Sequence, residues 1–312
     1  MHFLVTGGSG YLAQALGHFL ITQNETVTLA SRNAITNLME IPGCRNIQID
    51  FADDCSISSA LDDIDVVIHC AGINAYDSLK NPTLAEQVNS KNTLRIIEQA
   101  QGRVKTFVYI STIHVYSDNL RGEITESSKT VNEHPYALSH LNGEMHVRKF
   151  AHLFPEGAFS VRLANTFGIP INTESSGWDL VINNLCRQAV QKNKIQLNSN
   201  PLIARNFLPI DIASAGIYEL ILKRDVYKSI QVFNLGADKN MTLGEVSILI
   251  SKACLELFGL NIKPEYPNPT NILQDDSFKF TSMYIQFKSV DIFDAIRNLL
   301  REIQIMNING QI

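Results

Sequence analysis

The first fourteen residues, MHFLVTGGSGYLAQ, decide the fold of this chain. The apolar run Phe3-Leu4-Val5 predicts a buried strand, and the amphipathic stretch 12–21 predicts a helix. Gly7, Gly10 and Ala13 give the turn between them the spacing G-x-x-G-x-x-G/A. A strand, a glycine-rich turn and a helix in this order predict a dinucleotide-binding site.

Glycine suits this turn because it lets the backbone bend tightly and approach a pyrophosphate, whose charge is stabilised by the N–H groups at the helix N-terminus. The residues expected to contact the cofactor here are Gly7, Ser9, Gly10, Tyr11 and Leu12. A glycine-rich turn that binds no ligand has the same pattern, so the prediction depends on the motifs further along the chain.

Length and composition are those of an ordinary globular protein, with 312 residues, 45% of them apolar and 18% charged. The net charge of −5 gives no electrostatic reason to expect a nucleic acid or a membrane surface as partner. No apolar run approaches the roughly 18 to 20 residues of a membrane-spanning helix. Because the first strand begins at residue 2 or 3, no signal peptide is expected.

The five cysteines are scattered and form no C-x-x-C pair: Cys44, Cys55, Cys70, Cys186 and Cys254. This pattern predicts reduced thiols, without a disulfide framework or a metal site. We therefore expect a cytoplasmic protein that binds no metal.

Further apolar runs predict strands at 26–30, 46–49, 65–70, 105–111 and 158–163, with helices at 82–100 and 136–150. Alternating strands and helices predict an α/β fold built on a doubly wound parallel sheet. After residue 165 the pattern loosens. We expect helices at 178–191, 212–222, 243–258 and 291–303, a strand at 231–235, and surface loops at 117–133 and 264–282. Residues 1–165 are predicted to bind the dinucleotide. Residues 166–312 form mainly a small interwoven substrate lobe, and 206–236 return to the first domain.

Residues at the strand ends indicate how the adenosine is held. The strand at 26–30 ends in Ser31 and Arg32, with no acidic residue for the ribose of NAD, so NADP is slightly favoured. The alternative is that Arg32 is a solvated loop residue. Asp50 could accept from the adenine amino group while Phe51 covers the ring, or both could form an ordinary strand-end turn.

The strand at 65–70 is followed by a turn that lets the backbone approach the cofactor closely, at Cys70, Ala71 and Gly72. His69 is predicted to be a core histidine and not a ligand.

Several motifs in a fixed order resemble the extended short-chain dehydrogenase/reductase family, in its NAD-dependent epimerase/dehydratase group acting on nucleotide-sugars. The similarity covers about residues 2–255 and includes 6–13, 67–72, 88–89, 108–116, 136, 162–168, 205–207, 233–236 and 242–245. The resemblance implies a Rossmann-type sheet and hydride transfer at a sugar carbon.

The resemblance also implies roles for single residues. Tyr136 is the general acid/base, Thr112 bonds the same substrate oxygen, and Ser111 lies beside the cofactor. Asn165 contacts the sugar-nucleotide and Arg205 a substrate phosphate. Thr112 could instead be a strand-end hydroxyl and Tyr136 a core-edge tyrosine. Asn165 could be a turn residue and Arg205 a surface ion-pair partner.

His140 departs from the family pattern, which has a lysine four residues after the tyrosine. The lysine lowers the tyrosine pKa and holds the nicotinamide ribose, whereas a histidine with a pKa of about 6.5 is mostly neutral at pH 7. This leaves three hypotheses. His140 is a working catalytic and cofactor-binding substitute, protonated or relaying through water; the protein binds a dinucleotide but is catalytically weak; or another group, such as His114, supplies the charge.

The sequence therefore predicts an NAD- or NADP-dependent reductase or epimerase of a nucleotide-sugar, of the kind that feeds polysaccharide synthesis. The rival is a catalytically impaired dinucleotide-binding regulatory or interaction protein. A homodimer is plausible because family members often pair through the helices near residues 90 and 140.

Overall fold

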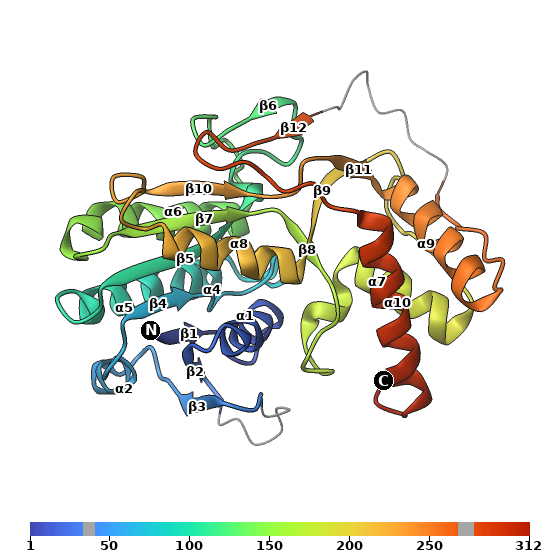
Figure 1. Ribbon diagram of the computed structural model, residues 1–312. Helices are drawn as coiled ribbons and strands as arrows, with labels where there is room; N and C mark the ends of the chain where they lie inside the picture. The colour runs from blue at the N-terminus through green and yellow to red at the C-terminus, as the bar shows by residue number, and fades with distance from the viewer. Residues whose placement is uncertain (34–40, 268–277) are drawn as a thin grey trace. The chain divides into compact units, whose positions relative to one another are not determined.

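The central feature of the fold is a parallel sheet in the order β10-β7-β5-β4-β1-β2-β3 (Figure 1). The computed structural model describes residues 1–33, 41–267 and 278–312. Within them the seven strands of this sheet are β1 (His2–Thr6), β2 (Thr26–Ser31), β3 (Cys44–Gln48), β4 (Val66–His69), β5 (Thr106–Thr112), β7 (Ala158–Leu163) and β10 (Val232–Leu235). The α/β fold with a doubly wound parallel sheet is confirmed.

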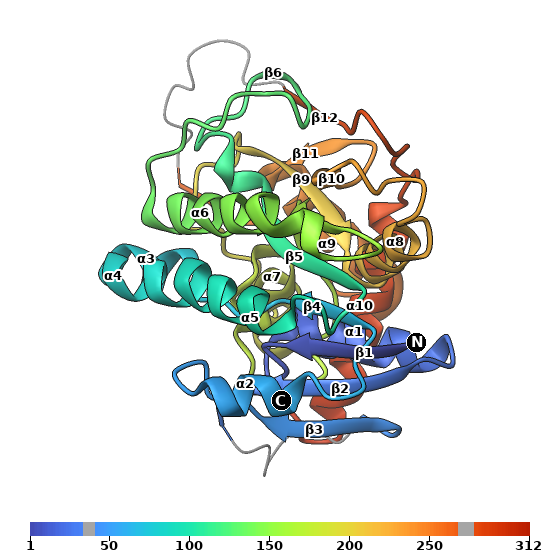
Figure 2. The same ribbon diagram turned by 90° about the vertical axis from the view of Figure 1, so that its left-hand side faces the viewer.

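Helices cover both faces of this sheet, as Figures 1 and 2 show. α1 (Tyr11–Thr22) and α8 (Ile210–Leu222) lie on one face, where Phe19 of α1 meets Tyr218 of α8. α2 (Asp54–Ala60), α5 (Asn92–Ala100) and α6 (Pro135–Phe150) lie on the other. The inner strands β1, β4, β5 and β7 are rich in apolar residues because both of their faces are buried, whereas β3 at the sheet edge is partly exposed.

The helix expected at 82–100 is built from three pieces. α4 (Pro82–Ala85) leads into the π-helical segment η1 (Glu86–Lys91), and α5 completes the helix. A π-helical segment wraps one extra residue into a turn, which an apolar period read from the sequence does not reveal.

Some short helices were not predicted from the sequence. α2 and α3 (Ala75–Lys80) have too few turns to show an apolar period, and they begin at side-chain caps from Asp53 and Asn74. Two 3₁₀ turns, η2 (Ile113–Val115) and η3 (Ala151–Leu153), come directly after β5 and α6.

A second group of elements builds its own core. It contains a sheet in the order β11-β9-β8, a pair of strands β12-β6, and the helices α7, α9 and α10. The bounds are β6 (Gly122–Ile124), β8 (Asn165–Phe167), η4 (Ser176–Asp179), α7 (Val181–Lys192), β9 (Ala204–Pro209), β11 (Asn240–Thr242), α9 (Leu243–Phe258), β12 (Phe278–Phe280) and α10 (Ile292–Ile308). Thr242 and Glu245 form the capping box that the sequence predicts at the start of α9.

These elements divide the chain into two compact units. The first comprises 1–118, 126–163 and 214–235, and the second comprises 119–125, 164–213 and 236–312. The return to the first unit begins later than the expected residue 206, because β9 pairs with β8 and β11 of the second unit. Residues 119–125, expected to be loop, join the second unit because β6 pairs with β12. Residues 268–277 of the expected loop at 264–282 lie outside the described residues.

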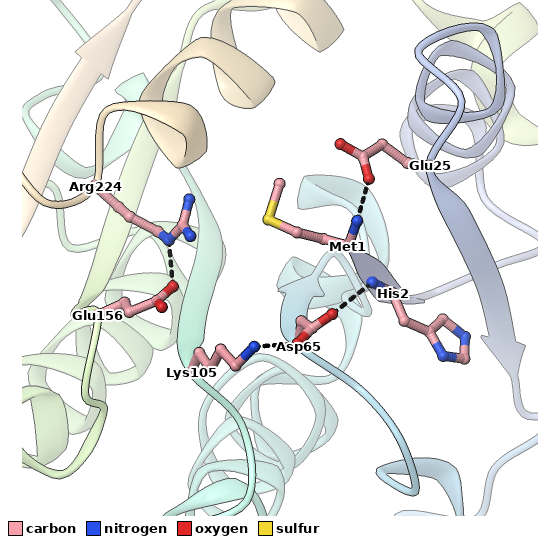
Figure 3. A network of polar contacts seen from close by, with 7 residues as sticks. All are labelled: Met1, His2, Glu25, Asp65, Lys105, Glu156 and Arg224. Atoms are coloured by element: carbon pink, nitrogen blue, oxygen red, sulfur yellow. Dashed lines mark hydrogen bonds and ion pairs between the residues drawn. The ribbon is translucent and has the colours of Figure 1, made fainter.

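Ion pairs tie together the amino ends of the strands in the first unit (Figure 3). Asp65, just before β4, accepts from the backbone N–H of His2 at 2.9 Å and from Lys105 Nζ at 2.6 Å. The Lys105 hydrogen bond lowers the pKa of Asp65. The charges at this edge pair with one another, and in sheets of this kind ligands bind at the opposite, carboxyl edge.

In the described parts of the chain, no helix has the length and apolar character needed to cross a membrane.

Candidate functional site

The turn after β1 has the geometry of a phosphate cradle. Gly7 has a φ of +74°, and a Cβ atom there would lie 3.0 Å from the backbone N and Cα of Ala71. Gly10 precedes α1, donates its N–H to the carbonyl of Gly7 at 2.7 Å, and would place a Cβ 3.0 Å from that same oxygen. Both positions therefore require glycine, and the turn ends on the N-terminus of α1, where an anion is stabilised.

His69 fastens this turn to the end of β4. The hydroxyl of Thr6 bonds His69 Nδ1 at 2.7 Å and accepts from the N–H of Ala71 at 3.3 Å. His69 is fully buried, and burial lowers its pKa to about 3, so the ring is neutral. It is a core histidine, as the sequence predicts, and it holds the Cys70-Ala71-Gly72 segment against the glycine turn.

The residues expected around the adenine are arranged as a strand-end turn. The Asp50 carboxylate accepts from the N–H of Ala52 at 2.8 Å. The ring of Phe51 is 5% exposed and packs edge-on against His69, so most of it belongs to the core. The adenine contacts expected for Asp50 and Phe51 stay predictions.

The residues at the end of β2 differ in exposure. Ser31 is buried and donates its hydroxyl to the carbonyl of Asn33 at 2.8 Å. Arg32 is exposed, and its carbonyl accepts from the Gln48 side chain. The guanidinium of Arg32 makes no ion pair with another described residue.

Thr112 and Tyr136 lie together at the carboxyl end of β5. Thr112 is the last residue of β5, and its hydroxyl accepts from the N–H of His114 at 3.2 Å. Tyr136 is half-buried in the first turn of α6, where its N–H donates to His134 Nδ1. Burial raises the pKa of Tyr136, against a smaller lowering by the hydrogen bond with Thr112, so the phenol keeps its proton at neutral pH.

His140 lies one helical turn beyond Tyr136, with the two ring centroids 4.6 Å apart. It is 7% exposed, and burial together with repulsion from His114 lowers its pKa to about 3. The ring is therefore uncharged at neutral pH. The structure disfavours a protonated His140 as the substitute for lysine, and it leaves the neutral-imidazole hypotheses open.

A buried ion pair secures the elements that carry these residues. Glu144 of α6 is paired with Arg162 of β7, whose Nε and Nη2 donate to the carboxylate at 2.9 and 2.6 Å. Both side chains are at most 4% exposed. Ser111, expected beside the cofactor, donates a hydrogen bond from its hydroxyl to the Glu144 carboxylate at 2.6 Å. Because the side chain is used in this way, we expect any contact of Ser111 with the cofactor to come from its main chain.

Two residues that were not predicted to belong to the site complete its frame. The Asn89 side chain accepts from the N–H of Ile73 at 2.9 Å and donates to the Ser139 hydroxyl at 3.0 Å. Tyr109 of β5 bonds His140 Nδ1 at 2.9 Å. The signal for Tyr109 is a polar tip on an otherwise apolar buried strand, since such a hydroxyl needs a partner.

The expected substrate residues Asn165 and Arg205 both belong to the second unit. Asn165 begins β8 and donates to the carbonyl of Asn206 at 3.2 Å. Arg205 lies on β9 and donates to the carbonyl of Ala204 at 3.0 Å. Their roles toward a substrate stay predictions.

Among the residues that the structure describes in both units, no group of three or more metal-binding side chains occurs. All five cysteines are free, and Cys186 and Cys254 are buried in the second unit.

Comparisons with known proteins place this geometry in a family. The sequence profile of the NAD dependent epimerase/dehydratase family matches residues 3–236. The dTDP-D-glucose 4,6-dehydratase of Homo sapiens is 25% identical over 258 residues, covering 78% of this chain and 71% of that protein. The putative UDP-glucose 4-epimerase of Methanocaldococcus jannaschii is 25% identical over 259 residues, covering 79% and 80%.

A solved structure shows the same fold. UDP-glucuronic acid 4-epimerase from Bacillus cereus, in complex with NAD, matches with a TM-score of 0.79 at 18% identity, covering 100% of this chain and 98% of that one. The chain belongs to the NAD-dependent epimerase/dehydratase family, whose named members here are nucleotide-sugar enzymes. The resemblance drawn from the sequence motifs is thereby confirmed.

Replacing Gly7 by alanine is expected to weaken dinucleotide binding by roughly tenfold or more. An alanine with this left-handed φ is strained by about 1–2 kcal/mol, and its Cβ would crowd the backbone of Ala71, so the turn has to move. The measurement is calorimetric titration with NAD and NADP. Gly102→Ala is the matched control: its φ is +72° and no atom lies within 4 Å of its added Cβ. It carries the same strain outside the turn and should keep wild-type affinity. Equal losses in both variants would contradict the cradle.

Proposed function

We propose that the chain catalyses the NAD(P)H-dependent reduction of a keto group on a nucleotide-sugar. The observation that carries this proposal is the placement of Tyr136 beside Thr112 at the carboxyl end of β5, with the buried ring of His140 4.6 Å away between centroids. Burial raises the pKa of Tyr136 and lowers that of His140. A phenol that keeps its proton at neutral pH is ready to donate it to a carbonyl oxygen.

The residues present fit a dinucleotide, because Gly7 takes a left-handed φ in close contact with the backbone of Ala71 and the turn leads directly into the N-terminus of α1. Gly7, Gly10 and the first turn of α1 would hold the pyrophosphate, and Ala71-Gly72 would lie beside it. When bound, NAD(P)H supplies the hydride.

Tyr136 and Thr112 act on the substrate oxygen. As the carbonyl carbon gains a hydride, Tyr136 gives its hydroxyl proton to the carbonyl oxygen, so the product is an alcohol and Tyr136 is left as tyrosinate. Solvent then returns the proton. Thr112, at the end of β5, hydrogen-bonds the same oxygen and orients it.

The Tyr136–His140 pair suits epimerisation and dehydration less well than it suits reduction. Both begin with removal of a proton from a sugar hydroxyl, which requires tyrosinate at the outset. Each unit by which the pKa of Tyr136 exceeds neutrality costs about 1.4 kcal/mol in the population of that form. The neutral ring of His140 offers no positive charge to offset it. The same property makes Tyr136 a weak acid, so we expect slow reduction.

The cofactor that we propose is NADPH, with NADH as the alternative that the NAD-bound Bacillus cereus structure supports. The exposed guanidinium of Arg32 suits the 2′-phosphate, and the end of β2 carries no carboxylate.

Arg32→Ala is expected to weaken NADPH binding by roughly tenfold, the value of one charge-assisted hydrogen bond, while NADH binding stays unchanged. Calorimetric titration of both cofactors against wild type and variant measures this. Should the variant lose affinity for neither cofactor, Arg32 is a solvated loop residue and the preference for NADP is wrong.

The substrate class that we propose is a nucleotide-activated keto-sugar, on the strength of the named relatives, with Asn165 and Arg205 as its contacts. The experiment monitors oxidation of NADPH and NADH by the wild type with UDP-, dTDP-, GDP- and CDP-keto-sugars. Oxidation with at least one of them is the expected result.

The alternative is that the chain is a catalytically impaired dinucleotide-binding protein. The neutral state of His140 favours this alternative. His140→Lys separates the two in the same assay. If the wild type oxidises no cofactor with any keto-sugar and the variant does, the native site is impaired and this alternative holds.

We also propose that the chain forms a homodimer through adjacent helices of the first unit, α3, α4 and α6 (Figure 2). They expose large apolar side chains: Tyr76, Leu79, Leu84, Leu138 and Met145. Such side chains gathered on neighbouring helices favour association. Sedimentation velocity should give the dimer mass, and a monomer at every concentration would contradict the proposal.

A further inference from the structure

The hydroxyl of Tyr109 lies between two groups in the interior of the first unit. One is the backbone carbonyl of Asn89, at 2.9 Å, and the other is His140 Nδ1, also at 2.9 Å. Tyr109 is 1% exposed, and burial raises the pKa of its hydroxyl well above the ordinary value, so it carries its proton at neutral pH.

These distances leave one arrangement of the protons. A carbonyl oxygen can only accept, so the single proton of Tyr109 must point at Asn89. The Tyr109 oxygen then faces His140 Nδ1 with lone pairs, and a contact of 2.9 Å requires a proton on Nδ1. Because the His140 ring is neutral, its Nε2 carries a lone pair and no proton.

The Asn89 carbonyl that starts this chain of hydrogen bonds lies in the π-helical segment η1. It accepts from two side-chain hydroxyls, those of Tyr109 and Thr93, each at 2.9 Å. The Asn89 side chain is anchored in turn to Ile73 and Ser139. Both ends of the residue are therefore fixed, which holds the carbonyl, and through it the Tyr109 hydroxyl, in one orientation.

His140 Nε2 faces away from these hydrogen bonds, because the two ring nitrogens of an imidazole point to different sides. Nε2 has no hydrogen-bond partner within residues 1–33, 41–267 and 278–312. It does not belong to the fully buried polar atoms of these residues that lack a partner, so it is accessible, whereas Nε2 of His69 is such a buried atom. It is an open acceptor beside Tyr136, whose ring lies 4.6 Å from that of His140 between centroids.

We propose that Tyr109 is a positioning residue that fixes His140 as the Nδ1–H tautomer, so that Nε2 accepts a hydrogen bond from a hydroxyl of the cofactor's nicotinamide ribose. The ribose contact rests on the proposed function, whereas the tautomer does not. A lysine at this position can only donate, so the substitution of histidine reverses the direction of the hydrogen bond and removes the charge. The ribose hydroxyl then keeps its oxygen free to accept from elsewhere.

The test is long-range proton–nitrogen NMR of the histidine side chains in the whole, cofactor-free protein. His140→Gln assigns the signals by their loss. The expected result is a neutral His140 with the proton on Nδ1. A neutral His140 with its proton on Nε2 overturns the proposal even if Tyr109→Phe does not fold, and it leaves the proposed reaction untouched.

The second part of the test is the variant Tyr109→Phe. We expect His140 to become a mixture of the two tautomers, and the Kd for NAD(P)H to rise about three- to tenfold. Tyr227→Phe is the matched control: its ring packs on Phe233 in the same unit, away from these hydrogen bonds, and it should change neither readout. A folded Tyr109→Phe protein that keeps the pure Nδ1–H tautomer contradicts the positioning role. A changed tautomer with unchanged affinity contradicts the ribose contact.

Discussion

Replacing Tyr136 by phenylalanine is expected to lower kcat for keto-sugar reduction by about 10²–10⁴-fold, the usual contribution of a positioned general acid. The phenol is the proton donor in the proposed reaction, and Thr112 beside it offers an alcohol hydroxyl that is far less acidic. Only the hydroxyl is removed, so the packing of the ring against His140 stays as it is. The measurement is cofactor oxidation at saturating keto-sugar and NAD(P)H.

Binding and chemistry must be separated for this result to be informative. Tyr136→Phe should retain the wild-type melting temperature and bind NAD(P)H within a few-fold, because the glycine turn is untouched. Tyr227→Phe is the control, since its ring packs on Phe233, away from the glycine turn and from Tyr136. An unchanged kcat in Tyr136→Phe would show that another group delivers the proton, and the proposed mechanism would be wrong.

Replacing Glu144 by leucine is expected to lower the free energy of unfolding by about 3–5 kcal/mol, because it leaves the Arg162 guanidinium buried without its counter-charge. The double variant Glu144→Leu/Arg162→Met should be more stable than the single one, since no charge then remains in the interior. Urea unfolding monitored by circular dichroism measures this. The single tryptophan, Trp178, is a poor probe because it belongs to the second unit.

An exposed pair gives the scale for that comparison. Glu219 of α8 and Lys223, directly after the helix, form an ion pair in which both side chains are about half exposed, and Glu219→Gln should lower the stability far less than Glu144→Leu. If Glu144→Leu costs no more than Glu219→Gln, or if the double variant is less stable than Glu144→Leu, the ion pair does not secure β5, α6 and β7 in the way described.

The sheet and the glycine turn could be predicted because their signals are local. Each buried strand is a short apolar run, and Gly7 and Gly10 stand at fixed spacing between a strand and a helix. The exchange of lysine for histidine at residue 140 was equally plain, since Tyr136 fixes its register on one helix.

The parts that could not be predicted depend on contacts between residues far apart in the sequence. Nothing in the sequence around Phe51 tells that its ring packs edge-on against His69. Ser111 turns to Glu144, 33 residues away, and Tyr109 to His140, 31 residues away. An apolar period cannot report such side-chain partners, because it records only which face of an element is buried.

The charge at His140 is another property that required the structure. In water a histidine titrates near neutrality, so the sequence leaves its charge open. Burial on α6 beside Tyr109 and Tyr136 lowers its pKa to about 3 and settles the ring as neutral. We therefore expect the glycine turn to determine pyrophosphate binding and Tyr136 to determine proton transfer, so that either can be lost without the other.

The most direct test of the central claim is the transfer of deuterium from NADPH or NADH, labelled at the nicotinamide carbon that gives the hydride, to a nucleotide-keto-sugar. Mass spectrometry of the sugar is the readout. The account predicts an alcohol product that carries one deuterium for each cofactor oxidised, and no such product with Tyr136→Phe. A wild-type protein that binds the cofactor yet transfers deuterium to none of the UDP-, dTDP-, GDP- and CDP-keto-sugars would contradict it.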